Sequence, residues 1–234
     1  MSVPDVDAVV LGAGGSARMA GLDKMLAPLG DREVIVWSLR AFEAAPSIRR
    51  VVVTSSAENR AGIERAIDAA GLAKVVGVID GGPSRAHSVL NALDVLEDDG
   101  ARFAAIHDGA RPFVTAELIE RGVAAVRRHG AVVAAVPSSD TVKLVGAEGV
   151  VIETPPRAQV WLAQTPQFGR LHELLAAHRR RRERLASFTD DVSVLEAEGI
   201  AVYVFEADAG NFKIATPADL ERARQLMAAA RNAR

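Results

Sequence analysis

The sequence predicts an α/β fold in which a mostly parallel sheet is covered by helices on both faces. Short apolar runs alternate with longer segments of helical periodicity up to residue 136. The runs are apolar almost throughout, as expected for strands that are buried on both faces. With 234 residues, 49% of them hydrophobic, the chain is long enough for one such domain with a single core.

Five apolar runs of strand length lie in the N-terminal part of the chain. We expect strands at 7–11, 50–54, 75–79, 103–107 and 131–136. The intervening segments carry apolar residues at helical spacing, and we expect helices at 34–44, 58–70, 84–96 and 116–128. In open sheets of this kind, ligands bind at the carboxyl ends of the strands. The segments that directly follow the strands are therefore the expected place for function.

The alternation ends after Pro137. Two strand-like segments, 141–145 and 150–154, flank GAEG and predict a hairpin. An isolated two-stranded hairpin is only marginally stable, so it must pack against the parent domain or another subunit, and we favour a second copy of the chain. The remaining expected elements are helices at 170–185, 190–198 and 217–230 and a strand at 201–205. We expect a single domain, 1–234, with a dimerisation arm at about 138–156.

The most informative stretch follows the first strand and reads VVLGAGGSARMAGLDK at 9–24. Glycines let the backbone turn sharply and expose its N–H groups, and such amides form an anion-binding concavity that nearby cations deepen. Arg18 and Lys24 supply the cations. We therefore expect a polyphosphate site at the tip of the first strand. On this stretch alone, a glycine-rich turn with two solvated cations is the alternative.

Three phosphate-binding motifs compete for this stretch. A P-loop is excluded because its Gly-Lys-Ser/Thr spacing is missing. Gly12, Gly14 and Ala17 fit a dinucleotide fingerprint, but the second strand and the acidic ribose ligand expected roughly 20 residues later are not evident. A nucleotidyltransferase loop carries Arg-Met or Arg-Leu and a later lysine over a nucleoside triphosphate. Arg18-Met19 and Lys24 favour this third interpretation.

Composition narrows the possible chemistry. A formal net charge of −2 provides no overall basic field for nucleic acid, and the arginine run at 179–182 is local. The absence of cysteine excludes disulfides, thiolate zinc sites and cysteine nucleophiles. The first ten residues lack the basic and apolar segments of a signal peptide, and no run reaches 18 apolar residues. We therefore expect a cytoplasmic protein that binds neither nucleic acid nor membrane.

Four further segments carry polar or charged residues suited to a nucleotide site. They are GGPSRAHS at 81–88, HDGARP at 107–112, RAQVW leading into AQTPQF at 157–168, and NFK at 211–213. Ser84 or Ser88 could bind a base edge, although Ser84 could also cap a helix. Asp108 suits a metal or ribose contact, with a surface Asp–Arg pair as the alternative. Arginine and lysine in the last two segments suit a phosphate dianion.

Together with DTVK at 140–143 and FTDD at 188–191, these motifs occur in the order found in one enzyme family. From residue 8 to about residue 226, the chain resembles the 2-C-methyl-D-erythritol 4-phosphate cytidylyltransferases of the non-mevalonate isoprenoid pathway. The resemblance implies a Rossmann-like nucleotidyltransferase fold with a protruding β-arm that builds a homodimer. It also implies cytidylyl transfer from CTP to 2-C-methyl-D-erythritol 4-phosphate, with release of pyrophosphate.

The resemblance also implies roles for individual positions. Arg18 and Lys24 match the catalytic pair that stabilises charge on the α-phosphate, and Asp108 matches the acid between the two substrates. The implied nucleotide-binding residues are Ala13, Gly14, Gly15, Gly82, Arg85, Ser88, Ala110 and Arg111. The implied residues for the second substrate are Thr141, Arg157, Thr189 and Lys213. The arm implies that Thr141 and Arg157 serve the active site of the other subunit.

The implied reaction needs no general base, because the second pKa of a phosphate monoester is about 6 and its dianion is already a nucleophile near neutral pH. Mg²⁺ is the expected cofactor, held mainly by the CTP phosphates and near Asp108. Three alternatives remain open: a cytidylyltransferase for another polyol phosphate such as ribitol 5-phosphate, a NAD-binding dehydrogenase, and a non-catalytic nucleotide-binding module. The last would fit two departures from the family pattern, Ser16 instead of glycine and Asp23 instead of proline before Lys24.

Overall fold

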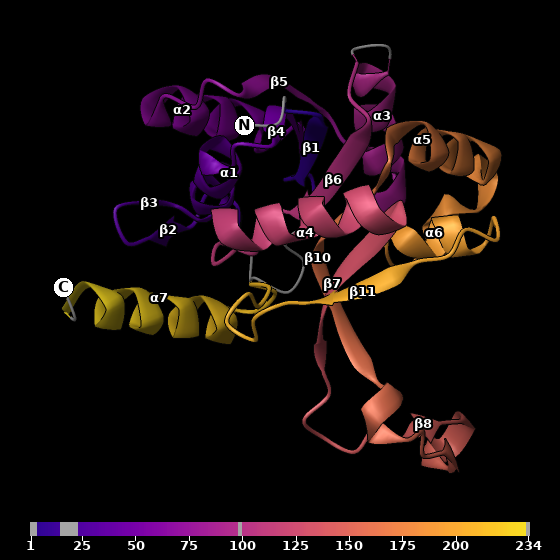
Figure 1. Cartoon of the computed structure of the whole chain (residues 1–234). Helices are drawn as coiled ribbons and strands as arrows, with labels where there is room; N and C mark the ends of the chain where they lie inside the picture. The colour runs from indigo at the N-terminus through magenta and orange to yellow at the C-terminus, as the bar shows by residue number, and fades with distance from the viewer. Residues whose placement is uncertain (1–3, 15–22, 98–99, 233–234) are drawn as a thin grey trace.

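The computed structural model describes residues 4–14, 23–97 and 100–232, and within them the α/β architecture predicted from the sequence is confirmed. A seven-stranded sheet with the order β11-β7-β10-β6-β1-β4-β5 forms its centre (Figure 1). Its strands are β1 (Val6–Leu11), β4 (Ile48–Ser55), β5 (Val75–Asp80), β6 (Phe103–Asp108), β7 (Ala131–Pro137), β10 (Trp161–Arg170) and β11 (Tyr203–Glu206). Only β10 runs antiparallel to its neighbours in this sheet.

Helices cover both faces of the sheet. They are α1 (Val34–Ala44), α2 (Arg60–Ala70), α3 (Arg85–Leu96), α4 (Ala116–His129), α5 (Leu171–Arg180), α6 (Val192–Glu196) and α7 (Pro217–Asn232). Because side chains alternate along a strand, Ala8 and Val10 of β1 pack with α1, α2 and α4, whereas Val9 and Leu11 pack with α3, α5 and α6. This two-sided burial explains the continuous apolar run. No helix among these described residues is both long and apolar enough to cross a membrane.

A smaller apolar cluster joins α7 to the main domain. It includes Leu29 of the short hairpin β2 (Pro28–Leu29) and β3 (Arg32–Glu33), together with Ile214 and Leu220. The helix begins at Pro217, and Thr216 Oγ1 accepts a hydrogen bond from the backbone N–H of Asp219 at 3.2 Å. Because Ile214 and Leu220 of this cluster lie on either side of the turn before α7, their packing also fixes the segment that carries Lys213.

The structure corrects the expected fold at β10, because the sequence pattern does not predict a strand over 161–170. Polar residues interrupt its hydrophobic pattern, yet Gln164, Thr165 and Gln167 are all buried. β10 inserts between β6 and β7, so β6 and β7 are not neighbours in the sheet. The Thr165–Pro166 peptide bond is cis. Likewise, the helix expected over 170–185 ends as an α-helix at Arg180 and continues as a 3₁₀ segment, Arg182–Ser187.

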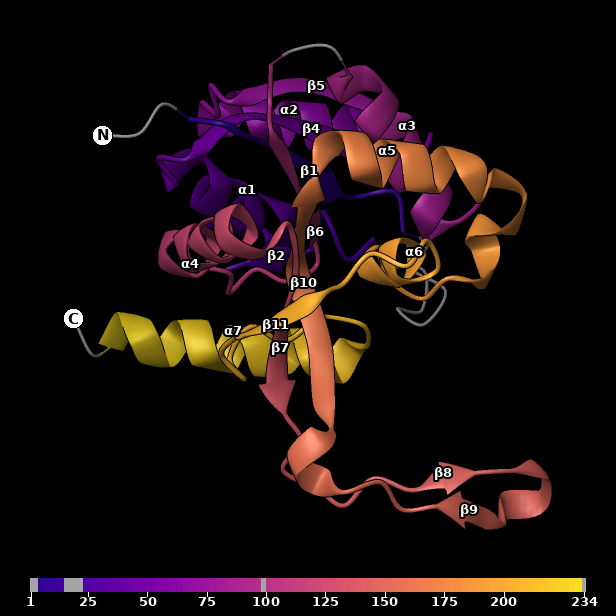
Figure 2. The same cartoon turned by 45° about the vertical axis from the view of Figure 1, so that its right-hand side comes forward.

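The hairpin predicted after Pro137 is present and lies away from the main sheet. β8 (Leu144–Val145) and β9 (Val151–Glu153) pair antiparallel, although both are shorter than expected. They are carried at the end of the extended segments that continue from β7 and lead into β10 (Figure 2). Their apolar side chains are exposed, Ile152 to 72%. The single subunit therefore leaves the apolar surface of this arm in contact with solvent.

Gly12 directly follows β1, at a point where a side chain does not fit. A Cβ atom there would lie 2.6 Å from the backbone oxygen of Thr54. We expect Gly12→Ala to lower the free energy of unfolding by about 1–3 kcal/mol, because the backbone must shift to make room. At Gly14 a Cβ would meet nothing within 4 Å, so Gly14→Ala is the matched control and should change stability by about 0.5 kcal/mol or less. Denaturant unfolding measures both, and equal losses would contradict the steric argument.

Candidate active site

A cavity of about 260 Å³ lies at the carboxyl ends of β1, β4 and β6. It is lined by Leu11, Ala13, Gly14, Lys24, Met25, Thr54, Gly82, Pro83, Ser84, Arg85, Ser88, Asp108, Ala110 and Lys213. Six of the eight positions expected to bind the nucleotide are in this set, namely Ala13, Gly14, Gly82, Arg85, Ser88 and Ala110. The position of the cavity agrees with the expected place for ligands in a sheet of this kind.

Ala13 and Gly14, which follow β1, line this cavity, and so does Lys24. Gly15 and Arg18 fall outside the described residues. Lys24 is only 7% exposed. The carboxylate of Asp23 accepts a hydrogen bond from the backbone N–H of Met25 at 2.7 Å, which turns the chain at Lys24. Asp23 thus constrains the backbone that carries the lysine.

The segment 81–88 forms another wall of the cavity, and its serine side chains are used within the segment. Ser88 Oγ accepts a hydrogen bond from the backbone N–H of Gly82 at 2.9 Å and donates one to the backbone oxygen of Ser84 at 3.1 Å. Ser84 caps α3, as one of the two sequence interpretations proposed. A Cβ on Gly81 would collide with that of Ala13. The hydroxyls of Ser84 and Ser88 are therefore engaged in hydrogen bonds within the segment.

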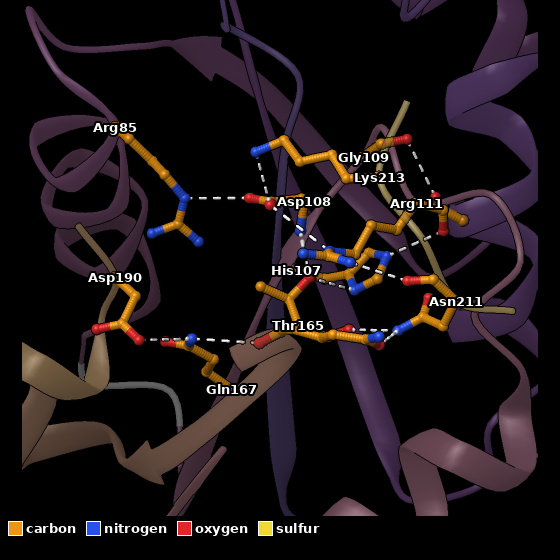
Figure 3. Close-up of polar contacts among 12 residues, drawn as sticks. Arg85, His107, Asp108, Gly109, Arg111, Thr165, Gln167, Asp190, Asn211 and Lys213 are labelled. Atoms are coloured by element: carbon orange, nitrogen blue, oxygen red, sulfur yellow. Dashed lines mark hydrogen bonds and ion pairs between the residues drawn. The ribbon is translucent and has the colours of Figure 1, made fainter. Parts of the chain in front are cut away.

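Asp108 ends β6 and is contacted by three cationic side chains (Figure 3). Arg85 Nε donates to its Oδ1 at 3.0 Å and Lys213 Nζ donates to its Oδ2 at 2.8 Å, while Arg111 Nε lies 3.8 Å from Oδ2. Burial alone would raise the pKa of Asp108, but the three positive charges outweigh it and hold that pKa well below its usual range. Asp108 is therefore a fixed anion in a buried cluster, and the alternative of a surface Asp–Arg pair is wrong.

His107 supports Asp108 from inside the sheet. Burial lowers the pKa of His107 to about 3, so the imidazole is neutral near pH 7. Its Nδ1 lies 3.0 Å from Thr165 Oγ1, which accepts a hydrogen bond from the backbone N–H of Asp108 at 3.0 Å. The Thr165 hydroxyl therefore donates to Nδ1, and Nε2–H faces the backbone oxygen of Arg111 at 3.4 Å. These bonds fix the turn that follows β6.

A second cavity of about 290 Å³ lies next to the first. It is lined by Arg85, Asp108, Arg111, Ala163, Gln164, Thr165, Gln167, Thr189, Asp190 and Lys213. Arg85, Asp108 and Lys213 line both cavities, and we call these three residues the shared wall. Of the residues expected at the second substrate, Thr189 and Lys213 lie here. Arg111, expected at the nucleotide, lines this second cavity instead.

Thr141 and Arg157 line neither cavity in the described part of this subunit. Both are exposed and lie where the arm leaves the sheet. Arg157 Nη1 donates to the backbone oxygen of Ser139 at 3.4 Å. Their expected place in the active site of another subunit stays a prediction.

Sequence reasoning missed several residues of the second cavity. Gln164, Thr165 and Gln167 belong to β10, and the motif AQTPQ was the available signal. The motif marked this segment as functional but not which of its side chains face the cavity. Their positions depend on the insertion of β10 beside β6, which no local pattern indicates.

Comparison with known proteins agrees with the geometry. The family model for 2-C-methyl-D-erythritol 4-phosphate cytidylyltransferase matches residues 6–229. A Synechococcus elongatus protein of that name is 41% identical over 221 residues, which cover 94% of this chain and 95% of the relative. The structure of 4-diphosphocytidyl-2C-methyl-D-erythritol synthase from Anaerococcus prevotii is 25% identical, with a TM-score of 0.84. The match covers 95% of this chain and 96% of the Anaerococcus chain. A 2-C-methyl-D-erythritol 4-phosphate cytidylyltransferase structure from Thermus thermophilus is 30% identical, with a TM-score of 0.74. The match covers 93% of this chain and 96% of the Thermus chain. The chain belongs to the 2-C-methyl-D-erythritol 4-phosphate cytidylyltransferase family.

Proposed function

We propose that the two cavities bind CTP and 2-C-methyl-D-erythritol 4-phosphate, and that the chain transfers the cytidylyl group between them. The products are 4-diphosphocytidyl-2-C-methyl-D-erythritol and pyrophosphate. The family match supports this reaction. The observation that carries the assignment of the site is the shared wall, because Arg85, Asp108 and Lys213 line both cavities. A triphosphate in one cavity and a phosphate monoester in the other would meet there.

The first cavity has the chemistry of a triphosphate site. Ala13 and Gly14 bring backbone to the cavity wall, and Lys24 adds a positive charge that is largely withdrawn from solvent. Lys24 would stabilise the charge that develops on the α-phosphate in the transition state, a task for preorganised donors. Arg18 shares this role in our proposal.

The second cavity suits a polyol phosphate. The hydroxyl of Thr189 can form a hydrogen bond with an alcohol group, and Lys213 can pair with the phosphate. An oxygen of the monoester dianion attacks the α-phosphorus of CTP, and the bond to the bridging oxygen of the β-phosphate breaks. Pyrophosphate leaves with that electron pair. Asp108 stays ionised throughout and holds Lys213 and Arg85 at the point of transfer.

The residues around the cavity fit a magnesium ion that arrives with the nucleotide. Among the described residues, no group of three or more His, Cys, Asp or Glu side chains is arranged to hold a metal ion by itself. Mg²⁺ in nucleotide sites is held by substrate phosphates, waters and one or two carboxylates. Asp108 is the carboxylate that lines the first cavity, and because its oxygens already pair with Arg85 and Lys213, Mg²⁺ would be held mainly by the phosphates. When bound, Mg²⁺ would neutralise charge on the phosphate oxygens.

We also propose that the arm pairs with a second copy of the chain. The exposed Val150, Val151 and Ile152 would be buried by such pairing. The positions of Thr141 and Arg157, away from both cavities of their own subunit, are consistent with a role in the partner's site. The cytoplasmic location expected from the sequence stays a prediction.

A pyrophosphate-release assay tests the proposed function most broadly. The chain is incubated with Mg²⁺, each of the four nucleoside triphosphates, and either 2-C-methyl-D-erythritol 4-phosphate or ribitol 5-phosphate. We expect release with CTP and 2-C-methyl-D-erythritol 4-phosphate. Preference for ribitol 5-phosphate would favour another polyol cytidylyltransferase, and no release in any combination would favour a binding module. A fluorescence titration with NADH checks the dehydrogenase alternative and should show no binding.

We expect Arg157→Ala to weaken binding of 2-C-methyl-D-erythritol 4-phosphate and to leave CTP binding intact. Loss of a charged hydrogen-bonding group corresponds to an increase in Kd of about 10- to 100-fold. Isothermal titration calorimetry with each ligand measures the effect. Arg128→Ala removes an exposed arginine from α4 and serves as the control. If CTP binding weakened and binding of the polyol phosphate did not, Arg157 would be wrongly placed.

A further inference from the structure

Asp191 is a fully buried carboxylate behind the shared wall, and it lines neither cavity. Its two oxygens face the guanidinium of Arg85. Arg85 Nη1 donates to Oδ1 at 2.9 Å, and Arg85 Nη2 lies 2.8 Å from Oδ2. Because Nε of the same guanidinium donates to Asp108, Arg85 is fixed between two carboxylates. This planar, multiply bonded geometry is one that arginine alone among the side chains provides.

The position of Asp191 is fixed by β10. The side-chain oxygen of Gln167 accepts hydrogen bonds from the backbone N–H groups of Asp191 at 2.9 Å and Val192 at 3.2 Å. The amide nitrogen of Gln167 donates to Asp190 Oδ2 at 3.1 Å and to the backbone oxygen of Gln164 (Figure 3). A continuous set of bonds thus leads from β10 through the turn before α6 to Arg85, and from there to Asp108 and Lys213.

We propose that Asp191 is a positioning residue for the transfer reaction, acting by holding Arg85 against Asp108 and so keeping Lys213 in place at the junction of the two cavities. The inference rests on the proposed function. Without the second carboxylate, Arg85 loses one of its two anchors beside two incoming polyanions. Its guanidinium would then be drawn toward a phosphate and away from Asp108. Binding of the anionic substrates would be kept or strengthened, while the alignment that transfer needs would be lost.

The electrostatics of Arg85 agree with this role. Burial alone would lower the pKa of Arg85, but Asp191 and Asp108 outweigh burial and raise that pKa above its usual value. The interaction with Asp191 therefore favours the charged, hydrogen-bonded state of Arg85 in which it bridges the two carboxylates. Removing the negative charge of Asp191 also makes the site more positive by one unit, which favours anion binding.

Asp191→Asn tests the proposal because it removes the charge with little change in volume. In the 234-residue chain, we expect kcat per CTP-binding site to fall about 10- to 100-fold. The upper value is the loss that a 1 Å misplacement of reacting groups causes. The KM values for both substrates should not rise. Pyrophosphate release provides the rates, and the calorimetric CTP stoichiometry provides the number of folded sites. A kcat that stays within about twofold of wild type would overturn the proposal.

A double-mutant cycle tests whether Asp191 acts through Arg85. If it does, adding Asp191→Asn to Arg85→Gln should change kcat by less than about twofold. If the fold-losses of kcat in the two single variants multiplied in the double variant, the proposal would be overturned. Arg85→Lys provides a second test that does not alter the buried carboxylate. It keeps the charge but lacks the planar fork with which Arg85 contacts both carboxylates, so we expect a lower kcat without a higher KM. An unchanged kcat would count against positioning.

Asp7→Asn is the matched control. Asp7 is also fully buried and pairs with Arg50, whose Nε donates to Oδ2 at 2.9 Å, but it lies near the start of β1. We expect this variant to lose stability and to keep kcat and both KM values within about twofold. Equal loss of kcat in both Asp→Asn variants would indicate general destabilisation and overturn the proposal. An inactive wild-type chain would instead contradict the proposed function, and this inference with it.

Discussion

Lys24→Ala is expected to lower kcat by about 10²–10³, the loss that follows removal of one preorganised donor from a developing anion. Lys24 is 7% exposed and lines the same cavity as Gly14, and the bond from Met25 to Asp23 constrains its backbone. Because a charge withdrawn from water acts more strongly on a nearby phosphate, its removal should affect the transition state more than the bound substrates. Steady-state pyrophosphate release measures kcat and KM. We expect the same loss for Arg18→Ala.

Lys74→Ala is the control for this substitution. Lys74 is a half-buried lysine whose Nζ donates to the backbone oxygen of Ala45 at 2.6 Å, and it lines neither cavity. The kcat of the Lys74→Ala variant should remain within about twofold of wild type. A loss smaller than fivefold in both Lys24→Ala and Arg18→Ala would remove the proposed role of these two residues in transition-state stabilisation.

Mixing two impaired variants is expected to restore activity if each site uses residues of both subunits. Lys24→Ala removes a residue that lines the cavity of its own subunit, whereas Arg157 lines neither cavity there. In a mixed dimer, one site would carry both changes and the other would carry neither. One of the two sites in a mixed dimer is therefore intact, so isolated mixed dimers should have about half of the activity of the wild-type dimer.

The mixing experiment is measured at a substrate concentration at which each variant alone has little activity. The two proteins are co-expressed with different affinity tags, and the doubly tagged dimers are assayed. Recovery would support both the dimer and the role of the arm. If isolated mixed dimers remained inactive, Arg157 would serve its own subunit. If no mixed dimer could be isolated, the result would contradict pairing between copies.

Much of the fold could be predicted because burial on both faces leaves a clear signal. β1, β4 and β6 appear in the sequence as short apolar runs, and the helices between them have regular periodicity. β10 could not be predicted in this way. Its polar residues are buried because they form hydrogen bonds and line the second cavity, so its composition does not match that of a core strand.

The candidate site could be predicted in parts. The motif HDGARP indicates Asp108 as a functional carboxylate, but the sequence does not show which cations surround it. Arg85 comes from the start of α3 and Lys213 from the segment before α7, so their contacts with Asp108 arise only when the sheet and helices pack. The buried roles of His107 and Asp191 likewise depend on long-range contacts. Spacing along the chain carries no information about such contacts.

A crystal structure with CTP and Mg²⁺ tests the central claim most directly, namely that the glycine loop and Lys24 hold the triphosphate beside the shared wall. We expect the phosphates to lie against the backbone of Gly14, with the Lys24 ammonium and the Arg18 guanidinium directed at the α-phosphate. Asp108 should lie between that phosphate and the second cavity. A nucleotide bound elsewhere, or Lys24 and Arg18 turned away from the α-phosphorus, would contradict it.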